Sequence, residues 1–177
     1  MRYHFCPVCA GPLEPESLSL LRCARCGYPF YQNSKPTANA VIPRTLRGRT
    51  EVLLARRGVE PFKGWWDLPG GFLHNGEQPL EGLARELREE LGLGLAGARF
   101  LAAYAERYPR QDIPEEAQFT LCLFYLCEIE GPAAAAADDI SEVRWFDLQT
   151  LPENLAFQGN RQALGLLGRQ LKGEGVT

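Results

Sequence analysis

The chain lacks any long run of apolar residues, and no segment approaches the roughly 20 residues that a membrane-spanning helix needs. Its first residues, 1–6, contain no extended apolar stretch of the kind found in secretory leaders. It also lacks an excess of positive charge, because 19 Lys and Arg residues stand against 22 Asp and Glu residues, for a net charge of −3. We therefore expect a cytoplasmic protein with no general basic field to attract membranes or nucleic acid.

The composition is otherwise that of an ordinary globular protein. Apolar residues make up 45% of the 177 residues and charged residues 23%, which predicts a packed core and a solvated surface. The length suffices for one full domain with a small addition. Residues 1–34 are richer in Cys, Pro and Gly than the rest, so we expect two units, 1–34 and 35–177.

Four of the six cysteines form two close pairs in the first unit, namely Cys6, Cys9, Cys23 and Cys26. Each pair has the C-x-x-C spacing, and Leu18–Arg22 between them is expected to form strands. Two such knuckles can bring four thiolates into one tetrahedron, which is typical of a structural zinc ribbon. Iron in a rubredoxin-like site uses similar knuckles and stays open as an alternative. Disulfides and a redox C-x-x-C are less favoured, because a reducing cytosol and the lack of a βαβ unit oppose them.

The second unit alternates strand and helix patterns. Strands are predicted at residues 37–42, 51–56, 100–104, 119–129 and 142–146, and helices at 77–91 and 157–171. The first helix has an apolar stripe formed by Leu80, Leu83, Ala84, Leu87 and Leu91. Strands mixed with a few helices indicate an α/β domain without internal repeats.

Three glutamates of the first predicted helix, Glu86, Glu89 and Glu90, share one helical face because they are three and four residues apart. Carboxylates this close repel one another, and a hard divalent cation such as Mg²⁺ removes the repulsion while accepting water and phosphate as further ligands. For the triplet taken alone, a solvated acidic face of an amphipathic helix is the favoured explanation. The Gly70-Gly71 pair ahead of the helix favours the metal interpretation, because glycine lets the backbone approach an ion or a phosphate closely.

The wider pattern resembles the complete signature of the Nudix hydrolase family. In order it comprises Gly71, five residues, Glu77, seven residues, Arg85-Glu86-Leu87, one residue, Glu89-Glu90, one residue and Gly92-Leu93. The preceding segment, 66–70, is similar to the strand that leads into this signature in the family. The resemblance implies a Nudix-type α/β/α sandwich over residues 35–177, preceded by a small zinc ribbon with four cysteine ligands.

The resemblance also implies an activity, which is hydrolysis of a nucleoside diphosphate linked to another moiety with Mg²⁺ or Mn²⁺ as cofactor. Glu86, Glu89 and Glu90 would be metal ligands, the carbonyl of Gly71 would be a further ligand, and Glu77 and Arg85 would form a structural pair. Glu86 is one candidate for the general base. Family members also recruit a glutamate from a later loop, for which Glu115 and Glu116 are candidates, although ordinary surface charge explains both equally well. Dimers are common in the family, so a homodimer is compatible with the resemblance.

A ribbon ahead of the signature resembles the layout of the NADH pyrophosphatases, but their Ser-Gln-Pro-Trp-Pro-Phe-Pro array is absent from the matching region, 103–110. ADP-ribose hydrolases of the family carry a proline some fifteen residues past the signature, and Pro109 lies sixteen past Leu93. We therefore expect a small-molecule nucleotide substrate, with ADP-ribose or a related nucleotide sugar or dinucleotide first. NADH and a modified nucleoside triphosphate are alternatives. A non-catalytic module that senses nucleotides or binds RNA or protein is the alternative from a different class.

Candidate substrate contacts are Arg56 and Arg107 for phosphate and Trp65 and Tyr104 for stacking on a base. Arg57, Trp66, Tyr108 and Phe157 belong to the wider sets of the same residue types. Surface charge for the arginines and core packing for the aromatics are the alternative explanations.

Overall fold

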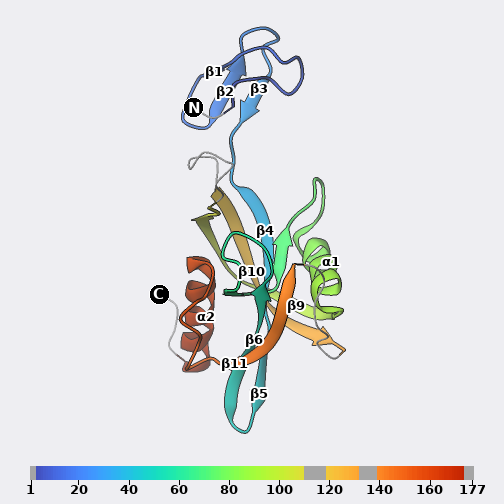
Figure 1. The fold of residues 1–177 in the computed structure, drawn as a ribbon, viewed down its shortest axis with the longest axis vertical. Helices are drawn as coiled ribbons and strands as arrows, with labels where there is room; N and C mark the ends of the chain where they lie inside the picture. Colours follow the sequence, from blue (N-terminus) through green and yellow to red (C-terminus); the bar gives the residue numbers. More distant parts are fainter. Residues whose placement is uncertain (1–2, 110–118, 132–138, 174–177) are drawn as a thin grey trace.

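The computed structural model describes residues 3–109, 119–131 and 139–173. Glu115 and Glu116, the candidate bases of the later loop, therefore lie outside the described residues. Figure 1 shows a small N-terminal sheet that stands apart from a larger body, with strand β4 leading from the one into the other.

The N-terminal sheet has three antiparallel strands, β1 (Leu13–Pro15), β2 (Leu20–Cys23) and β3 (Pro29–Tyr31), in the order β1-β2-β3. The prediction of a strand from Leu18 is wrong for its first two residues. The backbone N–H groups of Glu16 and Ser17 both donate to the carbonyl of Leu20, which closes a turn and leaves Leu18 fully exposed. Strand β2 therefore begins only at Leu20.

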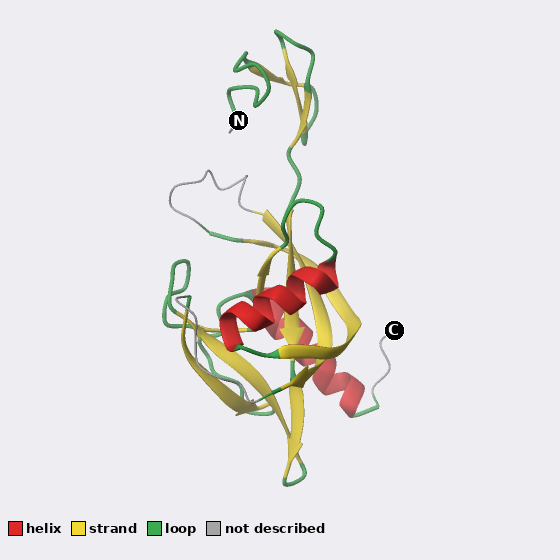
Figure 2. Cartoon of the chain, turned by 90° about the vertical axis from the view of Figure 1, so that its right-hand side faces the viewer, coloured by secondary structure: helices red, strands yellow, loops and turns green. Residues whose placement is uncertain are grey.

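The body contains one mixed sheet, one antiparallel sheet and two helices in the described part of the chain. Its elements are β4 (Lys35–Val41), β5 (Pro43–Leu46), β6 (Arg49–Arg57), β7 (Trp66–Asp67), β8 (Gly70–Phe72), α1 (Pro79–Leu91), β9 (Gly94–Arg107), β10 (Phe119–Glu130), β11 (Ile140–Asp147) and α2 (Gln158–Leu171). One sheet has the order β8-β4-β10-β9, in which β4 and β10 are parallel. The other has the order β11-β6-β5, with β7 paired to β6. The α/β/α sandwich is confirmed, since the sheets lie between α1 and α2 (Figures 1 and 2).

Alternation along β6 shows how the sequence builds the two cores. Val52 and Leu54 join the cluster that includes the buried leucines of α2, whereas Leu53 and Ala55 join the cluster that includes those of α1. Successive side chains of a strand point to opposite faces, so one apolar strand supplies both layers.

Helix α1 begins and ends at recognisable signals. Gln78 is its N-cap, with its backbone N–H donating to the Glu81 carboxylate at 3.2 Å, and Pro79 occupies the first turn. Gly92 adopts the left-handed conformation with φ 66° and closes the C-terminus, as its position predicts.

The buried stripe of α1 consists of Leu83, Leu87 and Leu91, four residues apart. The expectation for Leu80 is wrong, because this first-turn side chain is 42% exposed. Neither described helix has the length and apolar character required to cross a membrane.

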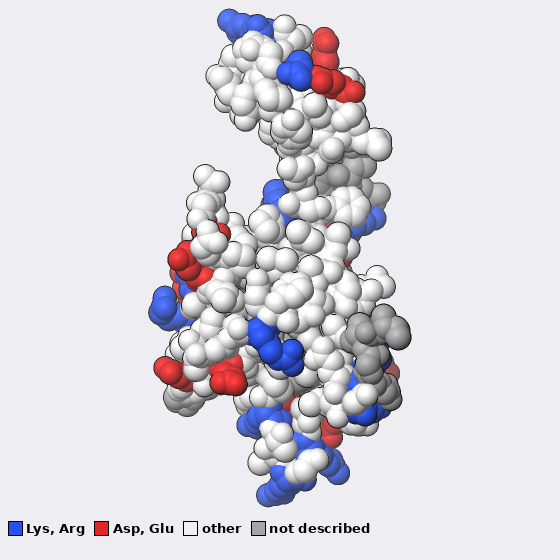
Figure 3. Space-filling model, turned by 180° about the vertical axis from the view of Figure 1, so that it is seen from behind, with Lys and Arg blue, Asp and Glu red and all other residues white. Residues whose placement is uncertain are grey.

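The surface in Figure 3 carries its largest group of Lys and Arg side chains at the end farthest from the N-terminal sheet, where β5 and β6 form a hairpin. Arg47 and Gly48 at the tip both have positive φ, 50° and 77°, which suits the twist of a two-residue hairpin turn. Arg44 of this group pairs with Glu51 across the strands at 2.6 Å. Part of the positive charge is thus neutralised locally.

Candidate active site

Gly70 and Gly71 are required for two different reasons. At Gly70, where φ is 137°, a Cβ atom would lie 2.1 Å from the backbone oxygen of Ala38 in the neighbouring strand β4. At Gly71 a Cβ atom would lie 2.6 Å from the carboxylate carbon of Glu86. The missing side chains therefore let β8 pack against β4 and let a carboxylate of α1 reach the strand backbone.

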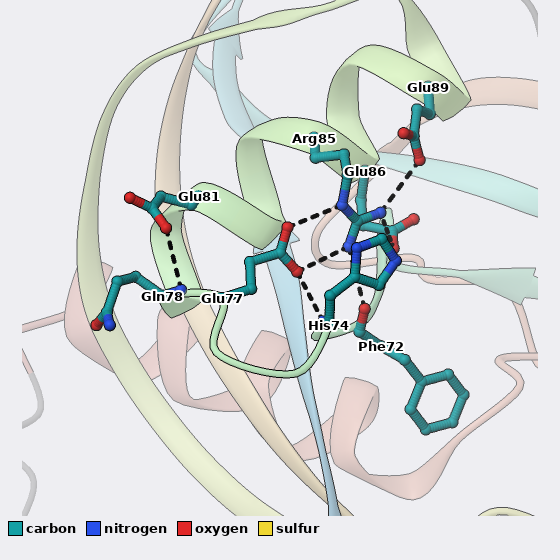
Figure 4. A network of polar contacts seen from close by, with 8 residues as sticks. All are labelled: Phe72, His74, Glu77, Gln78, Glu81, Arg85, Glu86 and Glu89. Carbon is teal, nitrogen blue, oxygen red and sulfur yellow. Dashed lines mark hydrogen bonds and ion pairs between the residues drawn. The ribbon is translucent and has the colours of Figure 1, made fainter.

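Arg85 connects the loop before α1 to the acidic face of the helix (Figure 4). Its Nε and Nη2 donate to the two carboxylate oxygens of Glu77 at 2.9 and 3.0 Å, and Nη2 also donates to the carbonyl of Phe72 at 3.1 Å. Its Nη1 donates to Glu86 at 2.7 Å and to Glu89 at 3.1 Å. The structure thus brings Glu77 and Arg85 together as a bidentate pair. Hydrogen bonding from Arg85 lowers the pKa of Glu77 to about 2.

Glu90 is half-buried at the end of the helix and faces the backbone of β8. It accepts a hydrogen bond from the backbone N–H of Gly70 at 3.0 Å. Burial raises the pKa of Glu90 to about 8, and the negative charges of Glu86, Asp67 and Asp139 add to the rise. The ionised form of this carboxylate is unfavourable in the metal-free protein, and a cation beside it would stabilise that form strongly.

The donor set at this point fits a hard divalent cation. Glu86 and Glu90 line the same cavity as Gly71, whereas the side chain of Glu89 is 58% exposed and lies against Arg85. Carboxylate and carbonyl oxygens are the ligands that Mg²⁺ and Mn²⁺ prefer. The geometry therefore favours Glu86 and Glu90 over Glu89 as residues that face the substrate.

The cavity beside these groups has a volume of about 290 Å³. Gly71 and the two glutamates line it together with Arg57 and the aromatic rings of Phe72, Tyr108 and Phe157. The rings of Tyr108 and Phe157 are stacked, with centroids 5.5 Å apart and an interplanar angle of 15°. Acidic and basic groups thus share one concave space of the size expected for a nucleotide fragment.

Arg57 is held in place from several sides. Its Nη1 donates to Asp67 at 2.7 Å, its Nε to the carbonyl of Pro61 at 2.6 Å, and its guanidinium carbon lies 5.2 Å from the ring centre of Phe157. Burial raises the pKa of Asp67, and the adjacent guanidinium opposes this effect. A cation fixed in this way is prepared to bind an anionic group of a ligand.

None of the four substrate-contact residues proposed from the sequence lines this cavity. Arg56 donates to the carbonyl of Gly64 at 2.9 Å and pairs with Glu142 on the surface. Trp65 is 40% exposed beside Phe62. Tyr104 packs on Phe124 in the core cluster that includes the buried leucines of α2. Arg107 is exposed at the end of β9.

Several cavity residues were missed by sequence reasoning. Asp139, just before β11, and Glu106, near the end of β9, both line the cavity. Glu106 accepts hydrogen bonds from the N–H of Gly159 at 2.9 Å and from the thiol of Cys122 at 3.1 Å. No local pattern marks these carboxylates, because strands distant in the sequence bring them to the site.

The four cysteines of the N-terminal sheet form one cluster. Their sulfur atoms all lie within 4.8 Å of one another, and all four are free thiols rather than disulfides. The backbone N–H groups of Val8 and Cys26 point at the sulfurs of Cys6 and Cys23, at 3.4 and 3.5 Å. Gly11 leaves the space for this arrangement, since a Cβ atom there would lie 3.2 Å from the sulfur of Cys9. Four thiols at this spacing suit a tetrahedral metal ion.

Comparison with known proteins agrees with this geometry. The family model described as NUDIX domain matches residues 35–166. An ADP-ribose pyrophosphatase of Methanocaldococcus jannaschii is 36% identical over 132 residues, which cover 73% of this chain and 71% of that protein. A NUDIX hydrolase from Nitrosomonas europaea of known crystal structure is 26% identical with a TM-score of 0.70, covering 98% of this chain and 96% of that one.

A second relative carries a different name. The NAD-capped RNA hydrolase NudC of Chromobacterium violaceum is 31% identical over 152 residues, which cover 85% of this chain. The chain spans only 52% of the length of that relative. The NUDIX domain of Shewanella oneidensis NrtR has a TM-score of 0.64 at 23% identity and covers 78% of this chain and 89% of its own, which shows the shared fold alone.

Proposed function

Because the chain belongs to the Nudix hydrolase family, whose members cut phosphoanhydride bonds, we propose that it hydrolyses a nucleoside diphosphate joined to another moiety, with ADP-ribose the first candidate. One observation carries this proposal. A single cavity joins the signature carboxylates Glu86 and Glu90 to the fixed cation Arg57 and the rings of Tyr108 and Phe157. A diphosphate would lie between the signature carboxylates and Arg57, with the nucleoside against the aromatic rings of the same cavity.

Glu86 and Glu90, with the carbonyl of Gly71, would hold the divalent cation, Mg²⁺ or Mn²⁺. When bound, such an ion polarises a phosphoryl oxygen and lowers the pKa of a water molecule. Arg57 would neutralise phosphate charge on the opposite side, and Arg85 fixes the position of Glu86. Asp139 joins Glu86 as a candidate to accept the proton of the attacking water, since it lines the same cavity. The role of Glu115 or Glu116 as the general base stays a prediction.

A dinucleotide such as NADH or NAD is the second candidate. The NudC relatives favour it, since the NAD-capped RNA in their name contains an NAD unit. The four cysteines would hold a structural zinc ion that organises residues 1–34 without taking part in the chemistry. A cytoplasmic location and a homodimer also stay predictions.

The test is a substrate panel with Mg²⁺ in which products are identified. ADP-ribose should yield AMP and ribose 5-phosphate, whereas a dinucleotide should yield two mononucleotides and a nucleoside triphosphate should yield a monophosphate and pyrophosphate. Activity toward ADP-ribose that exceeds the other classes supports the first candidate. Tight nucleotide binding without turnover, unchanged in Glu90→Gln, would instead establish a sensor.

A further inference from the structure

Asn160, in the first turn of α2, is the most buried polar side chain among the described residues, with 2% exposure. It lines the candidate active-site cavity. Its Nδ2 donates to Oδ1 of Asp67 at 2.7 Å, but its Oδ1 has no hydrogen-bond partner among the described residues. A buried acceptor without a partner costs free energy, and a ligand that donates to it would recover that cost.

The orientation of the Asn160 amide is set by chemistry. Asp67 bonds Arg57 through one carboxylate oxygen and Asn160 through the other, both at 2.7 Å. The permanent cation of Arg57 donates to Asp67 and favours its ionised form, which can only accept, so the nitrogen of the Asn160 amide faces it. The oxygen must therefore face away from Asp67, and Asp67 acts as a positioning residue.

Aromatic rings line the same cavity as this acceptor. Phe157 is three residues before Asn160 at the start of the same helix, and its ring stacks on Tyr108 within the cavity wall. A third ring, that of Phe62, meets Phe157 edge-on at 5.1 Å. Aromatic faces bind flat heterocycles with little polar selectivity, so selectivity here must come from the hydrogen-bonding group.

We propose that Asn160 is a specificity-determining residue that accepts a hydrogen bond from an N–H donor on the ring of the substrate. This inference rests on the proposed function, because it assigns a ring-recognising residue in the same cavity. The donor group would be an exocyclic amine, as in adenine, or a carboxamide, as in nicotinamide. A ring that presents an oxygen at this place would be rejected, because two acceptors would face each other and Asp67 prevents the amide from turning over.

The experiment measures binding of mononucleotides in Mg²⁺ by titration calorimetry, which needs no turnover. AMP is compared with IMP, and nicotinamide mononucleotide with nicotinic acid mononucleotide, since each pair exchanges the N–H donor for an oxygen. In one of the two pairs, the wild-type chain should bind the ligand that carries the N–H donor about 10- to 100-fold more tightly than the ligand that carries the oxygen. This is the range expected when a buried polar group is left unpaired. The pair that shows the preference identifies which half of the substrate occupies this end.

Asn160→Leu should reduce this preference to less than about threefold, chiefly by weakening the donor ligand. Asp67→Asn should also reduce the preference for the N–H donor, because a neutral amide at position 67 lets the Asn160 amide turn over. If either residue had only a structural role, its substitution would change the affinities of both ligands of a pair equally. Gln162→Leu, at an exposed amide of the same helix, is the matched control and should keep the wild-type preference. Circular dichroism checks that each variant is folded.

Equal wild-type affinities within both pairs would overturn the assignment of Asn160, and this outcome needs no variant. A preference that Asn160→Leu leaves intact would overturn it as well. The proposed function is tested separately, by the substrate panel. Hydrolysis by a chain that shows no preference within either ligand pair would contradict only the role given to Asn160. A preference within one ligand pair, in a chain that hydrolyses none of the substrates, would contradict only the proposed activity.

Discussion

A Cβ atom at Gly71 would lie 2.6 Å from the carboxylate carbon of Glu86, closer than real Cβ atoms approach other heavy atoms. The strand β8 and the helix α1 are therefore in contact through a backbone position and a carboxylate, with no side chain between them. This contact sets where the Glu86 carboxylate lies relative to the cavity.

Gly71→Ala should displace the Glu86 carboxylate and lower kcat by about 100-fold, since displacements near 1 Å have such effects on catalysis. The melting temperature should change little, because the clashing atoms are at the end of a side chain. Gly168→Ala is the matched control, since a Cβ atom there meets nothing within 4 Å and alanine favours the helix. Steady-state kinetics with thermal melts would check both, and full activity of Gly71→Ala would contradict the role given to Glu86.

The raised pKa of Glu90, about 8, predicts that Mg²⁺ and a proton compete for this carboxylate. At pH 7 the metal-free group is mostly protonated, so binding of Mg²⁺ should release close to one proton. The affinity for Mg²⁺ should rise with pH and level off above about pH 8. Calorimetry in buffers of different ionisation enthalpy measures the released protons.

Glu90→Gln provides the control for that proton. The variant should release none and should lose at least about 100-fold in kcat, since removing even a supporting partner of a metal ligand costs about 10- to 100-fold. Proton release that persists in Glu90→Gln would assign it to another group.

Glu77→Gln should destabilise the folded chain in a pH-dependent way. The folded pKa of Glu77, about 2, is below its ordinary value of 4.5, so its stabilising contribution is complete above about pH 4.5. The contribution is lost as the pH falls through about 2, because the protonated group no longer pairs with Arg85. Chemical unfolding should show a difference between wild type and variant at pH 7 that narrows toward about pH 3. Glu153→Gln, on the surface away from Arg85, is the control and should show no such difference.

Asp139→Asn should lower kcat more than it raises KM if Asp139 accepts the proton of the attacking water. A decrease of about 100-fold is expected from the usual contribution of general-base catalysis. Affinity for Mg²⁺ should be retained, because Glu86 and Glu90 remain. A variant with wild-type kcat would leave Glu86 as the candidate base within the described residues.

Cys9→Ser should release about one zinc ion per chain and lower the melting temperature, since four-thiolate sites contribute directly to folding. Metal analysis by mass spectrometry checks the stoichiometry. Cys127→Ser, at a buried thiol of the body, should keep the zinc. Purified wild-type protein without zinc or iron would contradict the ribbon assignment.

Local features of this protein could be predicted from sequence because short-range interactions decide them. The helix of the signature, its C-cap at Gly92 and the acidic face follow from spacing within some twenty residues. The two C-x-x-C knuckles are equally local, and their meeting requires only a short connecting sheet. Leu18 and Leu80 are exceptions, because a turn in one case and exposure of the first helical turn in the other override an apolar pattern.

The substrate end of the cavity was decided by tertiary structure. Arg56 and Arg57 are neighbours of the same type. The pairing of β6 with β11 places Arg56 beside Glu142 on the surface, whereas the pairing of β6 with β7 places Arg57 near Asp67 in the cavity. The parallel pairing of β4 with β10 and the approach of Asn160 to Asp67 join residues more than 80 positions apart. Sequence by itself determined the family signature, and through it the predicted metal ligands and the class of bond to be cut, because the signature residues lie on one helix and its loop. Which groups face the rest of the substrate depends on strand register and long-range packing, which no local pattern encodes.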